Sequence, residues 1–206
     1  STNIAASDIS GITGTVNTET LTMSSGLGTT SSANVGTYNL TDTSAGTLSL
    51  ANGSNGGLAA NYTLTGGTQT YTVTQRVLNS SGSKTYDANT NALAGAITLS
   101  NLVSGEALNH SGTATTSSAN AGSYTISNLS GISIADGSGG AASNYTLTGG
   151  THNFTINQRP LNATLARQYD GTTNAAGSDL SSFDALQGGE TLTLSGSGTA
   201  ANDNVA

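Results

Sequence analysis

The sequence Asn-Tyr-Thr-Leu-Thr-Gly-Gly-Thr-Gln-Thr-Tyr-Thr-Val-Thr-Gln-Arg-Val-Leu-Asn occupies residues 61–79 and returns at residues 144–162. The second copy reads Asn-Tyr-Thr-Leu-Thr-Gly-Gly-Thr-His-Asn-Phe-Thr-Ile-Asn-Gln-Arg-Pro-Leu-Asn, and 13 of its 19 positions are identical. Most of the replacements are like for like, as Tyr71 becomes Phe154. A stretch of this length that recurs almost unchanged indicates an array of repeats.

Apolar and polar residues alternate with a period of two on both sides of the glycine pair. This alternation is typical of strands with one buried and one exposed face. Gly66 and Gly67 predict a two-residue hairpin turn, which would place Tyr62 opposite Tyr71 and the aromatic pair of the second copy in the same register. A glycine bulge within one long strand is the alternative interpretation.

Two further motifs recur with nearly the same spacing. A Tyr-Asp marker stands at Tyr86 and Asp87 and returns at Tyr169 and Asp170. The segment 31–38 returns as 117–124, at a slightly larger offset, and the glycine-rich segment 52–57, a predicted surface loop, accounts for the difference.

This phasing divides the chain into three repeats. We expect a first repeat at 1–76 that lacks its first strand, a complete second repeat at 77–159 and a partial third repeat at 160–206. We also expect the sequence to be part of a longer protein.

Each repeat is the size of a small module with one modest core. Six or seven short strands separated by turn signals predict an all-β fold, a row of small immunoglobulin-like β-sandwiches of about 83–86 residues. The alternative is a β-grasp-like module with one short helix, at 102–106 and in the third repeat at 183–187.

The composition excludes several classes of protein. The net charge is −7 with only four Lys and Arg residues, so no basic surface for nucleic acid can be assembled. No long apolar run predicts a membrane span in this sequence, and the absence of cysteine excludes a disulfide scaffold. Weak net charge and phased alternation favour folding over disorder.

No convincing active site can be built from the sequence. His110 and His152 are not at equivalent positions in the repeats, so they predict no repeated metal site. The glycine loop that begins at Asp136 lacks the alternating acidic ligands of a calcium loop. We expect no enzyme, no metal and no cofactor. The recurring acidic residues are expected to cap turns (Asp) or face solvent (Glu): Asp8, Asp179, Asp87, Asp170, Glu19, Glu106 and Glu190.

Two Gln-Arg pairs keep a charge in a chain that has few. Gln75 with Arg76 and Gln158 with Arg159 each stand shortly before a marker tyrosine, where consecutive repeats join. We expect these residues to set the junction through a salt bridge or hydrogen bond, with Asp87 or Asp170 as partner. A ligand-binding arginine is the alternative.

The set of motifs resembles the YDG-type and MBG-type tandem repeats of large bacterial surface exoproteins, including filamentous-haemagglutinin-like adhesins of two-partner secretion. The motifs that carry the resemblance are Lys84-Thr-Tyr-Asp-Ala, Arg167-Gln-Tyr-Asp-Gly, Asn-Val-Gly-Thr-Tyr and Asn-Tyr-Thr-Leu-Thr-Gly-Gly. The resemblance implies β modules in the stalk or filament of an adhesin or biofilm-matrix protein on the surface of a Gram-negative cell. It transfers no catalytic residue.

Three functions remain open at this point. A structural spacer would contact only neighbouring copies of the repeat. A module that binds extracellular polysaccharide or host surface glycans would need exposed aromatic residues, so exposed Tyr86 and Tyr169 would favour it. A filament subunit would exchange strands between chains, and the segment around Leu161, Leu165 and Tyr169 has the sequence of the strand that the first repeat lacks.

Overall fold

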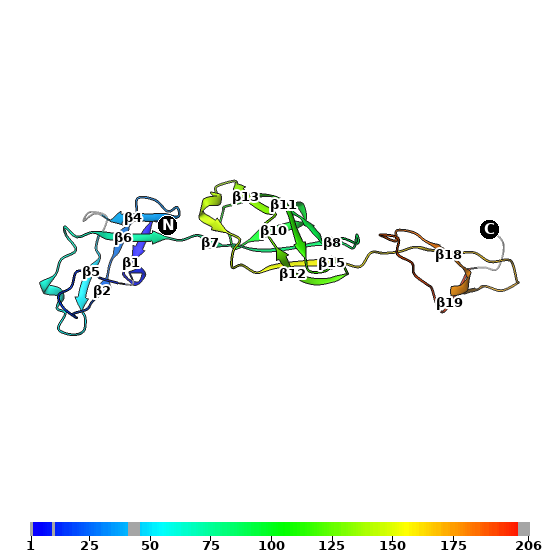
Figure 1. Ribbon diagram of the computed structural model, residues 1–206, viewed down its shortest axis with the longest axis horizontal. Helices are drawn as coiled ribbons and strands as arrows, with labels where there is room; N and C mark the ends of the chain where they lie inside the picture. Colours follow the sequence, from blue (N-terminus) through cyan, green and yellow to red (C-terminus); the bar gives the residue numbers. More distant parts are fainter. Residues whose placement is uncertain (1, 10, 41–45, 202–206) are drawn as a thin grey trace. The chain divides into compact units, whose positions relative to one another are not determined.

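The computed structural model describes residues 2–9, 11–40 and 46–201 (Figure 1). The contacts within the chain divide it into two compact units. One unit comprises Ser1–Arg76 with Gly140–Thr146, and the other comprises Val77–Gly139 with Leu147–Ala206. The all-β prediction is confirmed, because strands make up 43% of the structure and no helix in its described part reaches seven residues. Within the described ranges, no helix is long and apolar enough to cross a membrane.

The first unit contains three two-stranded antiparallel sheets, formed by β1 with β3, β2 with β5, and β4 with β6. Short strands β7 and β14 also pair. The bounds are β1 (Asn3–Ala5), η1 (Ala6–Asp8), β2 (Leu21–Ser25), β3 (Leu27–Thr29), β4 (Gly36–Leu40), β5 (Ser49–Asn52), η2 (Ala59–Asn61), β6 (Gln69–Val73), β7 (Arg76–Val77), η4 (Ala142–Asn144) and β14 (Tyr145–Thr146).

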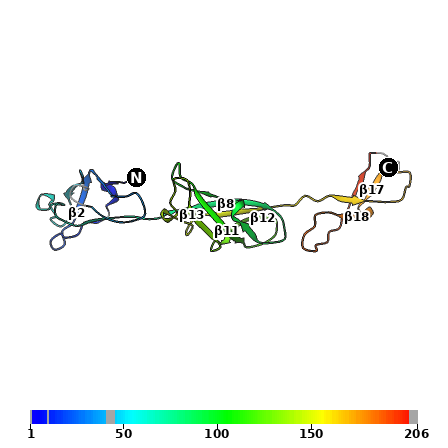
Figure 2. The same cartoon turned by 90° about the horizontal axis from the view of Figure 1, so that it is seen from above.

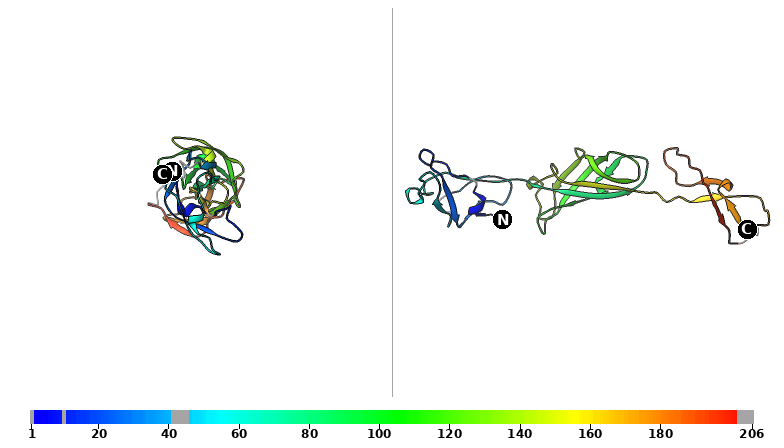
Figure 3. Two further views of the ribbon diagram at one scale, coloured as in Figure 1. Left: turned by 90° about the vertical axis from the view of Figure 1, so that its left-hand side faces the viewer. Right: turned by 90° about the horizontal axis from the view of Figure 1, so that it is seen from below.

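The second unit is built on one seven-stranded sheet that curls until it is nearly a barrel. Its order is β10-β8-β15-β12-β11-β13, with β9 paired to β11, and Figures 2 and 3 show the sheet from above and below. The bounds are β8 (Asn79–Thr85), β9 (Asn91–Leu93), η3 (Ala94–Ala96), β10 (Ile97–Ser100), β11 (Leu108–Thr116), β12 (Gly122–Asn128), β13 (Ile132–Asp136) and β15 (His152–Asn157).

The described part of the third repeat is less complete. It forms two small antiparallel sheets, in which β16 pairs with β18 and β17 with β19. Residues 202–206 of the predicted third repeat lie outside the described residues. The bounds are β16 (Ala163–Leu165), β17 (Asn174–Ala176), η5 (Gly177–Asp179), β18 (Leu180–Phe183) and β19 (Ser197–Thr199).

The centre of the seven-stranded sheet is a parallel pair. β8, the first strand of the second repeat, lies beside β15, its last strand, in a register that runs from Ser80 opposite His152 to Thr85 opposite Asn157. β10 covers the other edge of β8, and β12 covers the other edge of β15. Neither central strand is therefore an edge of the sheet.

The core lies on one face of this sheet. Phe154 and Ile156 of β15 are fully buried and pack with Ile97, Ile126 and Ile132. A Cβ at Gly82 of β8 would lie 2.2 Å from the Ala96 carbonyl oxygen and 2.9 Å from the Phe154 ring. Glycine at this position therefore lets the aromatic ring and a neighbouring backbone approach the strand closely.

The predicted hairpin at the glycine pair is wrong. Tyr71 lies opposite Tyr38 of β4, not opposite Tyr62, and in the second repeat Phe154 lies opposite Tyr124 of β12. The Gly67 N–H donates to the Leu64 carbonyl oxygen at 3.2 Å, so the glycines close a four-residue turn that does not bring the flanking segments into register. The aromatic cross-strand pair exists, but its partner comes from a different strand.

The short helix of the β-grasp alternative is absent at 102–106. That segment forms a turn in which the Glu106 N–H donates to the Val103 carbonyl oxygen at 3.0 Å. The same turn precedes Glu19 and Glu190, whose N–H groups donate to Val16 and Gln187. A turn with glycine or asparagine at a positive φ replaces the predicted helical turn.

Candidate functional site at the strand pair and the repeat junction

The central strand pair is fastened at both ends. At one end the Ser80 N–H donates to the Thr151 carbonyl oxygen at 2.9 Å, and at the other the Tyr86 N–H donates to the Asn157 carbonyl oxygen at 2.9 Å. A buried hydrogen bond of 2.9 Å also joins the Ser80 hydroxyl to His152 Nδ1. The first and last strands of the repeat are thus joined along their whole length.

His152 has a structural role that its counterpart shares. Its Nε2 lies 2.8 Å from the Leu147 carbonyl oxygen, and in the first unit Gln69 Nε2 donates to the equivalent Leu64 carbonyl oxygen at 2.8 Å. His110 Nε2 contacts the carbonyl oxygens of Ala94 and Ile97. Among the residues that the structure describes, no group of three or more His, Asp or Glu side chains could hold a metal ion.

The Tyr-Asp marker is a turn held by an ion pair. Lys84 Nζ lies 2.7 Å from Asp87 Oδ1, and Arg167 pairs with Asp170 in the same i, i+3 arrangement. Burial tends to raise the pKa of Asp87, but Lys84 and the Asn89 N–H outweigh it and hold the pKa below its ordinary value. Asp87 thus pairs with Lys84 of its own marker, a cation that the sequence analysis did not name as its partner.

Ala88 follows the marker where the third repeat has Gly171. Ala88 has a φ of 60° and Gly171 a φ of 76°, so both repeats make the same left-handed turn. Alanine is strained in this region by about 1–2 kcal/mol. The departure from glycine leaves the geometry unchanged and costs stability instead.

The predicted junction residues behave differently from one another. Gln75 Nε2 donates to the carbonyl oxygens of Ser143 at 3.2 Å and Tyr145 at 3.1 Å. Arg159 donates from one guanidinium nitrogen to the Tyr86 carbonyl oxygen at 3.4 Å, and its buried Nε has no hydrogen-bond partner among the described residues. Arg76 and Gln158 are exposed.

The acidic residues fulfil their predicted roles in part. Asp8 and Asp179 accept the N–H groups of Ala5 and Ala176 at 2.9 Å, and Asp170 accepts the Thr172 N–H at 3.0 Å, which confirms the turn-capping role. Two glutamates, in contrast, are engaged by tyrosines.

The tyrosine–glutamate pairs were not predicted. The Tyr62 hydroxyl donates to Glu19, and the Tyr86 hydroxyl donates to Glu190. The hydrogen bond to the glutamate raises the pKa of each tyrosine above its ordinary value. The recurrence of Glu before Thr/Ala-Leu in every repeat was the available sequence signal, but it did not reveal the partner.

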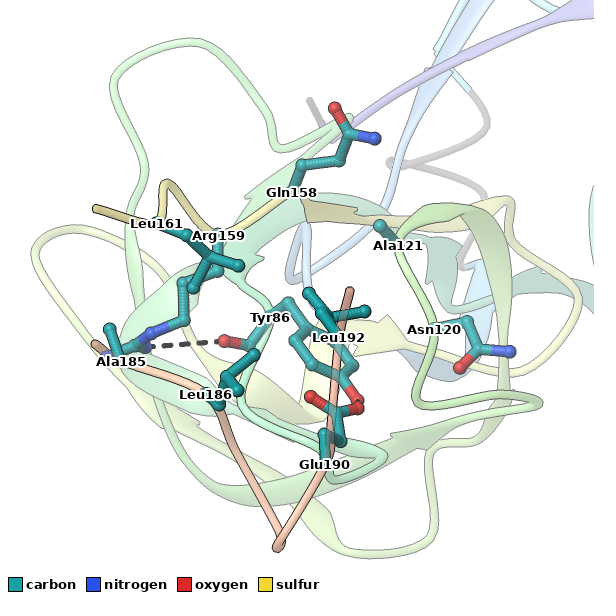
Figure 4. Close-up of a pocket in the computed structure, with 10 residues that line it drawn as sticks. All are labelled: Tyr86, Asn120, Ala121, Gln158, Arg159, Leu161, Ala185, Leu186, Glu190 and Leu192. Carbon is teal, nitrogen blue, oxygen red and sulfur yellow. Dashed lines mark hydrogen bonds between the residues drawn. The ribbon is translucent and has the colours of Figure 1, made fainter. Parts of the chain in front are cut away.

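A cavity of about 520 Å³ lies where the second repeat meets the third (Figure 4). Tyr86 lines it together with Leu186, Glu190 and Leu192, and the Tyr86 hydroxyl lies at the Glu190 carboxylate. The junction pair also contributes, since Gln158 and Arg159 line the cavity with Asn120, Ala121 and Leu161.

The predicted strand-exchange segment forms a strand of its own chain. Thr164 lies opposite Ser182, and Leu165 opposite Leu180, in the β16–β18 ladder. Tyr169 is 66% exposed, whereas its counterpart Tyr86 packs against the core. A binding role predicted that both marker tyrosines would be exposed. Tyr169 agrees with this prediction and Tyr86 does not.

A YDG domain is found at residues 68–152, a span close to the interval between the two marker tyrosines. It runs from the start of β6 to the start of β15 and includes the marker residues Tyr86 and Asp87. No curated protein and no solved structure matches the chain.

Proposed function

We propose that the chain is a stretch of load-bearing structural repeats from the stalk or filament of an extracellular adhesin or biofilm-matrix protein of a Gram-negative bacterium. The observation that carries the proposal is the parallel pairing of β8 with β15 at the centre of the second repeat. The YDG domain and the resemblance to repeats of surface exoproteins support the proposed location.

The parallel pair determines how the repeat responds to tension. The chain enters the repeat at the start of β8 and leaves it at the end of β15. Because the strands are parallel, these two points lie at opposite ends of the pair. Tension along the chain therefore slides one strand past the other, and it loads all the hydrogen bonds between them at once.

The surroundings of the pair add to this resistance. β10 and β12 occupy the outer edges of the two strands, so neither strand can peel away without breaking a second ladder. The fully buried Phe154 and Ile156 side chains of β15 must also leave the core before β15 can slide. A spacer that holds a distal domain under fluid drag needs slow unfolding under force.

Single-molecule pulling tests the proposal. Handles at the two ends of the full chain should give a high-force event that releases the segment from Asn79 to Asn157. That segment is roughly 260–280 Å long when fully extended, and the measured gain is this length less that of the folded repeat.

A matched control uses the same protein and changes only the direction of the load. The chain has no cysteine, so Thr85→Cys and Asn157→Cys place both handles at the same end of the pair. The strands should then separate one hydrogen bond at a time and at a much lower force. Equal forces in the two geometries would contradict a load-bearing role for the parallel pair.

Glycan binding is a second candidate, favoured by one observation. Tyr169 is exposed and could present its ring to a sugar. Titration with bacterial exopolysaccharide and host glycans, monitored by NMR, separates the two functions. A response that is lost in Tyr169→Ala would favour binding, whereas no response would leave the spacer function alone.

A further inference from the structure

A corner of the chain is held by three residues of the first repeat. The corner is the 3-10 helix η4 with Tyr145, residues Ala142 to Tyr145, which lies in the first compact unit. The Val35 N–H donates to Asn144 Oδ1 at 2.8 Å, and Asn144 Nδ2 donates to Asn34 Oδ1 at 2.9 Å. Gln75 binds the backbone on both sides of Asn144.

The second repeat carries the same three receptor positions. Asn120, Ala121 and Gln158 stand where the first repeat has Asn34, Val35 and Gln75. All three line the 520 Å³ cavity (Figure 4), and the structure shows no hydrogen-bond partner for the Asn120 side-chain amide, the Ala121 N–H or the Gln158 side-chain amide among the described residues.

The loops that present the receptor asparagines have the same geometry. The Tyr38 hydroxyl donates to the Asn34 carbonyl oxygen at 2.7 Å, and the Tyr124 hydroxyl donates to the Asn120 carbonyl oxygen at 2.7 Å. Each asparagine N–H also donates to a serine hydroxyl two positions earlier, at 3.1 Å in both repeats. The second site is therefore formed before an occupant arrives.

The corner itself has one fixed shape in both copies. Leu58, before η2, has φ −105° and ψ 121°, and Ala141, before η4, has φ −100° and ψ 122°. The tyrosines that follow are closer still, with φ −131° and ψ 155° at Tyr62 and φ −129° and ψ 156° at Tyr145. An Ala-(Ala/Ser)-Asn-Tyr corner is thus a rigid element that needs little ordering on binding.

We infer that the cavity between the second and third repeats is a docking site for the Ala-(Ala/Ser)-Asn-Tyr corner of a following repeat. The asparagine side chain of the corner accepts the Ala121 N–H and donates to the Asn120 amide oxygen, while Gln158 donates to the corner backbone. The inference rests on the tandem-repeat function proposed above and deepens it, because it names the segment that joins one repeat to the next.

The probe is a peptide with the sequence of residues 139–148, Gly-Gly-Ala-Ala-Ser-Asn-Tyr-Thr-Leu-Thr, titrated to 10 mM into the full chain. We expect NMR shifts at the amides of Asn120, Ala121 and Gln158, with a Kd on the order of 1 mM from these few hydrogen bonds. The Gln158→Ala chain should bind the peptide about fivefold to tenfold more weakly.

The control peptide carries alanine in place of its single asparagine and should cause no shift at these amides. The inference is overturned if the amides of Asn120, Ala121 and Gln158 do not move by 10 mM, or if the control peptide moves them equally. This readout does not depend on force, so a failed pulling experiment would reject the load-bearing function and leave the docking result standing.

Discussion

Strands β6 and β15 occupy equivalent positions in two repeats and share the same alternation of apolar and polar residues, yet the structure buries them to different extents. In the first unit Tyr71 and Val73 are half-buried, whereas their counterparts Phe154 and Ile156 are each 1% exposed. Among the described residues β6 pairs only with β4, but β15 has β12 on one edge and β8 on the other. The second neighbour therefore completes the core around β15.

Truncation of the aromatic residue should give the largest contrast. Phe154→Ala should destabilise the second unit by about 3–5 kcal/mol, because it removes a fully buried ring from the core. Tyr71→Ala should cost the first unit well under half as much. Hydrogen exchange of the β15 and β6 amides measures each unit separately, and equal losses would show that the second neighbour contributes little.

Closing the approach between β8 and β15 should have the next largest effect. In Gly82→Ala the new methyl group would meet the Ala96 carbonyl oxygen and the Phe154 ring, at an expected cost of about 1–3 kcal/mol. Gly95→Ala is the control, because a Cβ there would meet no described residue within 4 Å apart from its own neighbours in the chain. Denaturant unfolding of the second unit should show the difference, and two equal midpoints would refute the close packing.

Relief of the backbone strain in the turn that follows β8 should stabilise the second unit. Ala88→Gly removes a side chain from a residue with φ 60° and should add about 1 kcal/mol to the stability of the second unit. The reverse change, Gly171→Ala, should destabilise only the third repeat. The thermal midpoint should rise by a few degrees. A fall would mean that contacts of the Ala88 methyl group stabilise the fold by more than the backbone strain destabilises it.

A fall in pH should have the smallest effect on the stability of the second repeat. Because folding lowers the pKa of Asp87, the stabilisation is present above its unfolded pKa near 4 and is lost as the pH falls through the folded value. Asp87→Asn should remove this pH dependence at a cost below about 1 kcal/mol, since the Asp87 side chain is 38% exposed and its charge is screened.

The matched control for the acid experiment is Asp170→Asn. It should leave the acid response of the second repeat unchanged, because its partner Arg167 lies in the third repeat. Exchange rates of the β8 amides between pH 5 and 3 measure the effect. Identical acid profiles for the wild-type chain and Asp87→Asn would show that the ion pair does not stabilise the turn.

The sequence predicted the all-β class and the turn-capping aspartates, because these depend on alternation and on local hydrogen bonds. It did not predict which strands pair. The alternation at Tyr62 and Tyr71 requires a buried face, but it is equally consistent with a neighbour from any other strand, and the neighbour of Tyr71 is Tyr38. β8 is polar and has little intrinsic β propensity. It forms a strand because of its position in the tertiary structure.

The sequence predicted where the junction lies but not which groups interact there. Gln75 was expected there, and it does bind a segment far away in the sequence, but its acceptors are backbone carbonyl groups that no side-chain pattern could indicate. The ion pair of Asp87 with Lys84 was not expected, although the two residues are only three positions apart. The tyrosine–glutamate pairs connect residues 43 and 104 positions apart, so spacing could not reveal them.

The pairing of the first strand with the last also determines when a repeat can fold. Ser80 and His152 are 72 residues apart, so a chain that emerges from the ribosome must wait for most of a repeat before β8 finds its neighbour. Folding through such distant contacts is slow and usually invites aggregation. β8 has the sequence Asn-Ser-Ser-Gly-Ser-Lys-Thr, with no apolar side chain. Before it pairs, β8 therefore exposes little apolar surface to which another chain could bind.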